Sequence, residues 1–436
     1  MMLSKIQLII VGVVGFVIVF FGLVFSCVIP FRKGCEKQGP VVQGEIHLWA
    51  IGDSSSAYEK AMQSFRSKYP EVQVMPRIFR TQEEYEFALT EALIAGKGPD
   101  IFIIPNNGVL QSQSRVFPLP QGWISPFQLR QWFPQTVELD FAPQGIVYAL
   151  PTSLDTLALI YNRDLLNEAG IVVLPETWEE FKEIIPRLTT IDRTRKIVKG
   201  GAALGGSKKS VDRVTDIISL LMLQTGTAMV NKDLKSASFG SEEGLNALKF
   251  YTQFSNPASD VYTWSDSFSG TLDAFSQEKV AIMFDYSSAV PLIKERNPFV
   301  NLGLASVPQP KEATRKISYA HYWGYTVSLQ SRNPQLAWEF ILNLTTVPEN
   351  VEQYAMTTKK LPSLLSLINQ RTNDPDLAVF ARQSLIARSW PQVDPRAIED
   401  IFSRMVSLVI NNQASPRNAL DQAQNEVNEL MGRKTF

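Results

Sequence analysis

The pattern of hydrophobic and polar positions divides the chain into two unlike parts. Residues 8–31 contain no charged side chain, whereas short apolar segments alternate with amphipathic ones after residue 44. A helix of these 24 residues would be about 36 Å long, enough to cross the hydrocarbon core of a bilayer. We therefore expect a single uncleaved transmembrane helix at residues 8–31, followed by a short linker and a body that begins at residue 44.

Two other interpretations of the N-terminus compete with the uncleaved helix. A cleaved secretory signal normally has a shorter apolar region that ends at a small-residue site. A lipoprotein signal would use Cys27, for which Ser26 is an acceptable neighbour and Phe25 a poor one. The apolar run continues past Cys27 to Phe31, which favours the uncleaved helix and leaves the lipoprotein signal as the open alternative.

The charges beside the apolar stretch give only a weak signal for its orientation. Lys5 and the N-terminal amine precede it, and Arg32, Lys33 and Lys37 follow it. Positive charge tends to stay in the cytoplasm, so this balance slightly disfavours export of the body. The orientation therefore has to be argued from the function of the body.

Within the body, strand and helix patterns alternate. Residues 46–49 alternate as in a strand, and apolar positions between 58 and 69 follow the spacing of one helix face. A second strand at 72–78, a helix at 83–95 and a buried strand at 101–104 complete a βαβαβ succession. This succession predicts an α/β fold with a parallel sheet covered by helices. Later strands are expected at 280–284, 302–307 and 325–329, with helices opening at 177, 333 and 415.

Composition narrows the classes of function. The 42 Lys and Arg residues nearly balance the 43 Asp and Glu residues, which argues against nucleic acid as a partner because phosphate binding needs a basic surface. Two Cys and two His nearly exclude a structural zinc site, which takes four such ligands. Residues 1–43 hold both cysteines, four of the basic residues and one acidic residue, so the body is cysteine-free with a formal charge of −4.

No catalytic or nucleotide-binding motif is present. The Gly- and Lys-containing segment at 200–210 misses the GxxxxGK[ST] spacing of a phosphate-binding loop. The sequence also lacks a GxSxG turn and an HExxH helix, and His47 and His321 lie far apart along the chain. We therefore expect no catalytic residue, no metal and no cofactor.

A series of motifs runs in order along the body. It includes Gly145-x-x-Tyr-Ala-Leu-Pro151, Leu157-x-x-x-Tyr-Asn-x-Asp-Leu165, Glu168-Ala-Gly170 and Pro175-x-Thr-Trp-Glu-Glu-Phe181. This series resembles the extracellular solute-binding proteins of ABC importers, the group that contains maltose-binding and multiple-sugar-binding proteins. The resemblance covers about residues 44–436. It implies a two-lobed, periplasmic-binding-protein-like (Venus flytrap) α/β fold with discontinuous lobes, a ligand cleft between them and closure on the ligand.

The resemblance also implies where the lobes begin and end. Lobe 1 is expected at 44–152 plus 309–346, and lobe 2 at 153–308 plus 347–436, after the membrane anchor and linker at 1–43. Pro151, Pro308 and the turn at 345–348 are the expected crossing points. A protein of this kind binds its solute outside the cytoplasm, so we expect an extracytoplasmic body on a single-pass anchor in the cell membrane.

Polar candidates for ligand binding follow the strands, because open α/β sheets bind ligands at the carboxyl ends of their strands. Asp53 and Ser54 follow the first strand, where capping a helix is an equally good interpretation. Asn107 follows the strand at 101–104, where a turn is the alternative. The resemblance implies an acidic side chain that contacts ligand at Asp155, just past the expected hinge, where a solvated hinge residue is the alternative. Asp285 and the adjacent Tyr286 follow the strand at 280–284.

Aromatic candidates matter because proteins bind sugars with aromatic faces and nearby polar groups. Tyr322 and Trp323 precede Gly324 at the place where the family has a glycine-rich turn that lines the cleft. Trp264 and Trp390 lie in expected loops beside polar residues. For these two residues and for Trp323, anchoring the loop by packing is the alternative.

The expected function is that of a membrane-anchored receptor that binds a small solute and delivers it to ABC permease subunits. A sugar or oligosaccharide is the favoured solute, but Ile104 and Ala397 stand where maltose-binding relatives carry aromatic side chains, so sugar specificity does not transfer. Two alternatives stay open: a ligand-sensing module for a signalling partner, and a glycan-active enzyme with two carboxylates ~5–10 Å apart.

Overall fold

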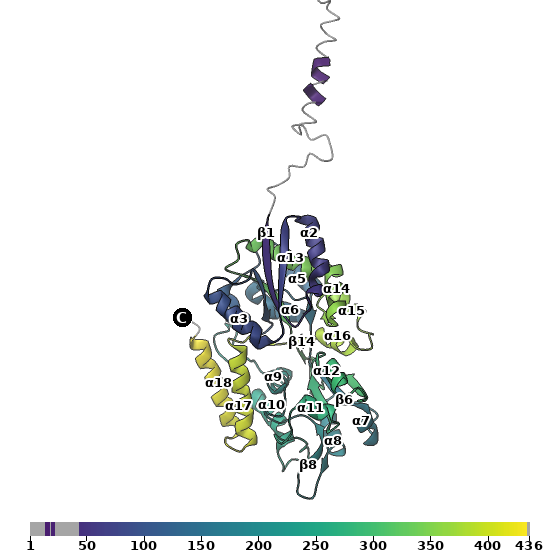
Figure 1. The fold of residues 1–436 in the computed structure, drawn as a ribbon. Helices are drawn as coiled ribbons and strands as arrows, with labels where there is room; N and C mark the ends of the chain where they lie inside the picture. The colour runs from purple at the N-terminus through teal and green to yellow at the C-terminus, as the bar shows by residue number, and fades with distance from the viewer. Residues whose placement is uncertain (1–13, 18, 22–42, 434–436) are drawn as a thin grey trace, which may run out of the picture. The chain divides into compact units, whose positions relative to one another are not determined.

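The computed structural model describes residues 14–17, 19–21 and 43–433, and most of these residues surround two sheets (Figure 1). Residues 14–17 and 19–21 are helical. The rest of the expected transmembrane segment at 8–31 lies outside the described residues. No helix within the described ranges is long and apolar enough to cross a membrane. The residues from 45 to 433, apart from 69–72, belong to one compact unit.

The first sheet combines the start of the body with a strand from much later in the chain. Its order is β2 (Val72–Phe79), β1 (Gly44–Ile51), β3 (Ile101–Pro105), β12 (Trp323–Ser328) and β4 (Val116–Phe117). β1 and β3 are parallel, whereas β12 runs antiparallel to both β3 and β4. The consecutive apolar residues of β3 are all buried, as expected for a strand covered on both faces.

Helices cover this first sheet. α2 (Glu59–Lys68) connects β1 to β2, α3 (Gln82–Ile94) connects β2 to β3, and the Thr81 hydroxyl caps α3 by accepting from the Glu84 N–H. α13 (Pro334–Thr346) packs on β12 and α2. α14 (Pro348–Thr358) packs on α2 and on the short helix η1 (Ser55–Tyr58). Shorter helices complete this part of the body: α4 (Val109–Ser112), α5 (Pro126–Trp132), α6 (Gln135–Phe141) and α15 (Leu365–Gln370).

The second sheet is built from the middle of the chain. Its order is β10 (Leu302–Ala305), β6 (Ala158–Asn162), β9 (Val280–Asp285), β8 (Ile197–Ala202) and β7 (Thr190–Ile191). β6 pairs antiparallel with both β9 and β10, and β8 pairs parallel with β9. Every residue of β6 and β9 is buried.

The helices around the second sheet come from two distant stretches of sequence. α8 (Trp178–Leu188) packs on β8, and its Trp178 ring lies 5.6 Å from that of Phe284 in β9. α17 (Pro395–Ile410) and α18 (Pro416–Arg433) end the described chain and pack on α9 (Val214–Gln224) and α10 (Glu242–Thr252) (Figure 1). The remaining helices here are α7 (Arg163–Glu168), α11 (Thr271–Ser276) and α12 (Ala289–Arg296).

Short strand pairs join segments that are far apart in sequence. β5 (Ser153–Leu154) pairs with β13 (Leu361–Pro362), and β11 (Ser318–Tyr319) pairs with β14 (Ala387–Arg388). A further helix, α16 (Ala378–Ser384), precedes β14. The chain therefore passes between the two sheets more than once, as a two-lobed protein with discontinuous lobes requires.

Candidate ligand-binding site

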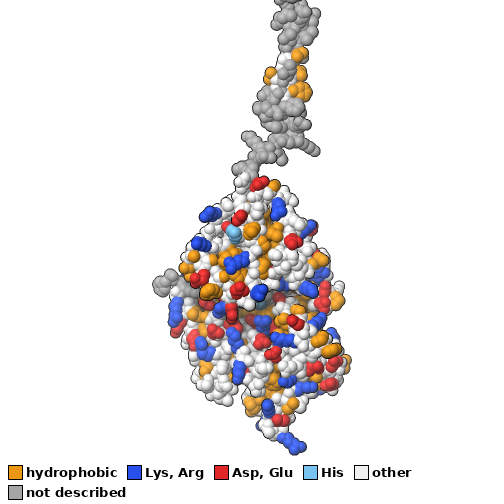
Figure 2. Space-filling view, viewed as in Figure 1, with side chains coloured by type: hydrophobic (Ala, Val, Ile, Leu, Met, Phe, Trp, Pro, Cys, Tyr) orange, Lys and Arg blue, Asp and Glu red, His pale blue; other side chains and the backbone are white. Residues whose placement is uncertain are grey.

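A cavity of about 240 Å³ lies between elements of the two sheets. One wall comes from α3, the end of β3 and the residues that follow it, and the other from the starts of α9 and α17. Figure 2 shows acidic and basic side chains side by side on the face of the body. The residues that line the cavity include Tyr85, Glu86, Ile103, Asn107, Arg115, Asp212, Arg213, Thr215, Asp216, His321, Trp323, Gln392, Arg396 and Glu399.

The wall of the first sheet is held by a buried tyrosine. The Tyr85 hydroxyl donates to the Ile103 carbonyl at 2.7 Å and accepts from the Ile103 N–H at 3.0 Å, which ties α3 to β3. The half-buried Trp323 ring meets the Tyr85 ring edge to face, with centroids 6.3 Å apart. A Cβ added at the next residue, Gly324, would lie 2.6 Å from the Phe141 ring, so only glycine fits there.

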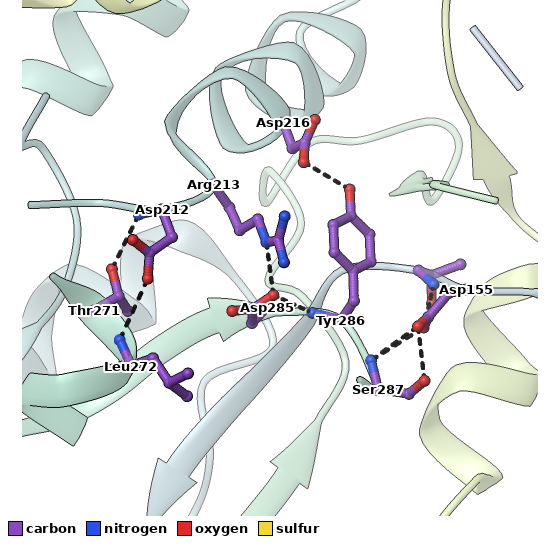
Figure 3. Close-up of polar contacts among 10 residues, drawn as sticks. Asp155, Asp212, Arg213, Asp216, Thr271, Leu272, Asp285, Tyr286 and Ser287 are labelled. Carbon is purple, nitrogen blue, oxygen red and sulfur yellow. Dashed lines mark hydrogen bonds and ion pairs between the residues drawn. The ribbon is translucent and has the colours of Figure 1, made fainter. Parts of the chain in front are cut away.

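The opposite wall carries a group of charged residues at the start of α9 (Figure 3). Arg213 Nε donates to Asp285 Oδ1 at 2.8 Å, and the guanidinium lies 5.1 Å from the centroid of the Tyr286 ring. The Tyr286 hydroxyl donates to Asp216 Oδ2 at 2.9 Å. Burial raises the pKa of Asp216 to about 6, although the Arg213 charge and the Tyr286 hydrogen bond oppose that shift.

His321 lies beside both walls. Its ring centroid is 5.3 Å from that of Tyr286 and 6.5 Å from that of Trp323. Burial, assisted by the Arg213 charge, lowers the pKa of His321 to about 4. The imidazole is therefore neutral at pH 7, with one nitrogen that donates and one that accepts a hydrogen bond.

Direct contacts join the two walls. Arg396 Nε of α17 lies 2.6 Å from Glu86 Oε2 of α3. The Gln392 N–H donates to the Asn107 carbonyl at 2.7 Å, and Asn107 Nδ2 donates to Gln392 Oε1 at 3.1 Å. Because the Arg396 side chain is 54% exposed, the ion pair stands at the boundary between the cavity and solvent.

Unsatisfied polar atoms gather around the cavity. Eight buried side-chain nitrogen and oxygen atoms in the described residues have no hydrogen-bond partner, and three of them belong to cavity residues: Asn107 Oδ1, Arg115 Nε and Thr215 Oγ1. Such groups are rare in folded proteins because each costs free energy. All three atoms are enclosed by protein, so their unmet hydrogen bonds are a cost carried by the walls of the cavity.

Four of the residues predicted from sequence belong to this region. Asn107 and Trp323 line the cavity. Asp285 and Tyr286 lie directly behind Arg213 and Asp216 and make hydrogen bonds to them. The carboxyl end of β9 therefore supports the site, whereas the start of α9 supplies the groups that face the cavity.

The structure places Asp53 and Ser54 away from the cavity. The buried Asp53 carboxylate lies 2.6 Å from Lys360 Nζ and accepts from the Tyr58 hydroxyl at 3.1 Å and from the Tyr354 hydroxyl. Ser54 caps η1 by accepting from the Ser56 N–H, as its capping interpretation predicted. These contacts tie the loop after β1 to α14 and to the segment that follows α14.

Asp155 is also held by the protein itself. Its carboxylate accepts from the Ser287 hydroxyl at 2.7 Å, from the Ser287 N–H at 3.1 Å and from the Thr156 N–H at 2.9 Å. Burial raises the pKa of Asp155 to about 6 despite these hydrogen bonds. The hydrogen bonds between Asp155 and Ser287, drawn in Figure 3, join the segment after β5 to the segment after β9.

The other aromatic candidates are packed inside the protein. Trp264 has no exposed surface, donates from Nε1 to Ser210 and stacks on Phe268 at 4.1 Å. Trp390 is 2% exposed and donates from Nε1 to Ser219. The buried Tyr322 hydroxyl donates to Asp140 at 2.7 Å. The structure does not bring these three side chains to the cavity.

Reasoning from sequence missed the charged residues that face the cavity. Arg213 and Asp216 lie at the start of an almost wholly apolar helix, and Arg396 and Glu399 lie in the first turn and a half of α17. The sequence contained one usable signal, which is the charged Asp212-Arg213 pair directly before the apolar run of α9. Ligand contacts were expected at residues that follow strands, so the residues at the starts of α9 and α17 were not among the candidates.

Comparison with known proteins agrees with this architecture. The maltotriose-binding protein of Pyrococcus abyssi is 22% identical over 78% of this chain and 71% of its own length. The galactooligosaccharide-binding protein of Bacillus subtilis is 22% identical over 87% of both chains. Both relatives are named as binding proteins.

Solved structures share the fold. The cyclic α-maltosyl-1,6-maltose binding protein from Arthrobacter globiformis matches with a TM-score of 0.75 and 19% identity over 90% of this chain and 100% of its own. The sugar-binding protein MalE from Xanthomonas citri matches with a TM-score of 0.73 and 19% identity over 90% of this chain and 98% of its own. The sequence profile of the family matches residues 51–350. The chain therefore belongs to the bacterial extracellular solute-binding protein family.

Proposed function

We propose that this protein is an extracytoplasmic receptor that binds a carbohydrate in the cavity between α3, β3, α9 and α17 and delivers it to an ABC permease. The observation that carries the proposal is the cavity itself. It combines the half-buried Trp323 ring with polar and charged side chains from both walls.

The chemistry of the lining favours a polyhydroxylated ligand. A sugar presents C–H faces that pack on aromatic rings, and hydroxyls that both donate and accept hydrogen bonds. The cavity offers donors at Arg213 and Arg115, acceptors at Asp212 and Asp216, and one aromatic ring at Trp323. The names of relatives that bind maltotriose and galactooligosaccharide support the same class.

Among the residues predicted from sequence, Asn107 and Trp323 are proposed to contact the ligand, because both line the cavity. Asp285 and Tyr286 are proposed to act through Arg213 and Asp216. No ligand contact is proposed for the remaining candidates, whose side chains make contacts with the protein itself: Asp53, Ser54, Asp155, Trp264, Tyr322 and Trp390.

The proposed lobes centre on the two sheets, and ligand capture is proposed to occur by closure about the segments that cross between them. The short pairs β5–β13 and β11–β14 are the proposed crossings. The packing of α14 on α2 and η1 supports a first lobe that continues past residue 346 into α14.

The proposed location is the extracytoplasmic side of the cell membrane, with residues 8–31 as an uncleaved anchor. The family is one of extracellular proteins, which supports a body outside the cytoplasm. Protease added to intact cells without an outer barrier should degrade the body and spare a cytoplasmic control protein. Protection of the body in such cells would contradict the proposed location.

A thermal-shift screen tests the proposed function. A molecule that binds only the folded state raises the melting temperature. The full-length protein is screened with maltotriose, a galactooligosaccharide, mannobiose, amino acids and polyamines. We expect a carbohydrate to produce the largest rise. A rise with amino acids or polyamines and none with any sugar would overturn the carbohydrate assignment.

A further inference from the structure

We propose that Arg213 binds the ligand from the second sheet's side of the cavity, using the forked edge formed by its two terminal nitrogens, and that Asp285 and Tyr286 hold that fork in place. This inference rests on the proposed function, since it specifies how the same cavity grips its ligand. Arg213 lies at the start of α9 and was not among the residues predicted from sequence.

Arg213 is positioned from two sides. Its Nε donates to the buried Asp285 carboxylate at 2.8 Å, which fixes one edge of the guanidinium plane. The Tyr286 ring lies 5.1 Å from the guanidinium carbon, and its hydroxyl is itself fixed by Asp216. In Figure 3 these three residues surround the Arg213 side chain. A guanidinium held in this way loses little further freedom when a ligand binds.

The opposite edge of the guanidinium is available. The structure shows no hydrogen bond from Arg213 Nη1 or Nη2 to any residue that it describes, and 36% of the side chain is exposed. Arg213 also lines the cavity. Nε therefore serves the protein, and the two terminal nitrogens are the groups left to bond whatever occupies the cavity.

The geometry of that edge selects a ligand chemistry. Two parallel N–H groups match two neighbouring oxygen atoms, which a carboxylate or a pair of adjacent sugar hydroxyls can supply. The surrounding charge decides between them. Asp285 already pairs with Arg213. Acidic residues outnumber basic ones in the cavity lining: Glu86, Asp212, Asp216 and Glu399 against Arg115, Arg213 and Arg396. An incoming carboxylate would meet these acidic groups, so adjacent hydroxyls of a neutral carbohydrate fit better.

The first test compares variants by calorimetric titration. The probe is whichever of maltotriose, the galactooligosaccharide or mannobiose gives the largest thermal shift with the wild type. Arg213→Gln should weaken its binding by about 10- to 100-fold, as expected for lost hydrogen bonds from a charged donor. Arg213→Lys keeps the charge but lacks the fork, so its affinity for the probe should lie between that of the wild type and that of Arg213→Gln.

A matched control separates the cavity from general effects of losing an arginine. Arg296 pairs with Asp273 elsewhere in the same part of the protein and does not line the cavity. Arg296→Gln should therefore bind the probe as the wild type does. The melting temperature of each variant without sugar shows whether the protein has folded.

A double-mutant cycle tests the positioning role of Asp285. Asp285→Asn should weaken binding in the wild-type background but cause no further loss in the Arg213→Gln background, because its effect passes through Arg213. If Asp285 were needed only for folding, Asp285→Asn would weaken binding by the same factor in the wild-type and Arg213→Gln backgrounds. Additive losses would overturn the positioning role.

The outcomes distinguish the two levels of the proposal. If no sugar binds the wild type, the proposed function fails and this inference fails with it. If a sugar binds the wild type and folded Arg213→Gln equally well, the inference alone fails. If a uronate oligosaccharide binds more tightly than every neutral sugar, and added salt weakens it, the preference for adjacent hydroxyls is wrong.

Discussion

At the residue scale, contacts with neighbouring elements decide which acidic side chains at strand ends serve the fold. The carboxylates of Asp53, Asp155 and Asp285 all accept hydrogen bonds from the protein, and Asp53 and Asp285 also form ion pairs. Asp216 lines the cavity and accepts from Tyr286. Position at the end of a strand is thus insufficient for ligand contact, because neighbouring elements can satisfy the same carboxylate first.

The stability of the fold should depend on pH through Asp155. Burial raises its pKa to about 6 in the folded protein, above the value of about 4 expected in the unfolded chain. The folded state therefore binds the proton more tightly, and this group stabilises the fold most at low pH. Its contribution falls as pH rises from about 4 to about 6 and is constant above that.

The corresponding experiment compares wild type with Asp155→Asn, which cannot titrate. As pH is lowered from 7 to 4, the free energy of unfolding of wild type should rise relative to the variant by about 1–3 kcal/mol. Urea unfolding at several pH values measures the difference. A difference that stays constant, or moves in the opposite direction, contradicts the raised pKa.

At the element scale, local signals predicted elements better than they predicted partners. The strand at 101–104 and the helix that follows Thr177 were evident from apolar runs and capping residues, and both are present. No local pattern showed that β12 would pair with β3, because about two hundred residues separate them. The resemblance to a known family placed residues 309–346 in the same lobe as residues 44–152, but it did not give this pairing.

The capping box of α8 provides the prediction at this scale. The Thr177 hydroxyl accepts from the Glu180 N–H, and the Glu180 carboxylate accepts from the Thr177 N–H. Thr177→Ala should lower the free energy of unfolding by about 1 kcal/mol. Thr177→Ser retains the hydroxyl and should cost much less. If chemical denaturation shows that both variants lose the same free energy of unfolding, the capping hydroxyl contributes nothing.

At the scale of the whole molecule, contacts across the cavity join the two walls whose closure is proposed to capture the ligand. The Glu86–Arg396 ion pair joins α3 to α17, and the Asn107–Gln392 hydrogen bonds join the segment after β3 to the segment before α17. An exposed ion pair contributes about 0.2–1 kcal/mol and weakens with salt. It can therefore favour closure without preventing release.

A charge swap tests this connection. Glu86→Gln should speed sugar dissociation by about two- to five-fold, because loss of the pair favours the open form. The double variant Glu86→Arg with Arg396→Glu restores an ion pair in the reverse sense and should return the rate toward that of wild type. Stopped-flow measurement of Trp fluorescence gives the rates. If Glu86→Gln releases the sugar at the wild-type rate, the pair plays no part in closure.

The most direct test of carbohydrate binding in this cavity is a calorimetric titration of wild type and Trp323→Ala with the sugar that gives the largest thermal shift. Trp323 is the half-buried ring that lines the cavity, so its loss should weaken binding while the protein stays folded. We predict saturable one-to-one binding by wild type and at least about ten-fold weaker binding by the variant. Equal affinity of the two folded proteins would place the ligand elsewhere and contradict the account.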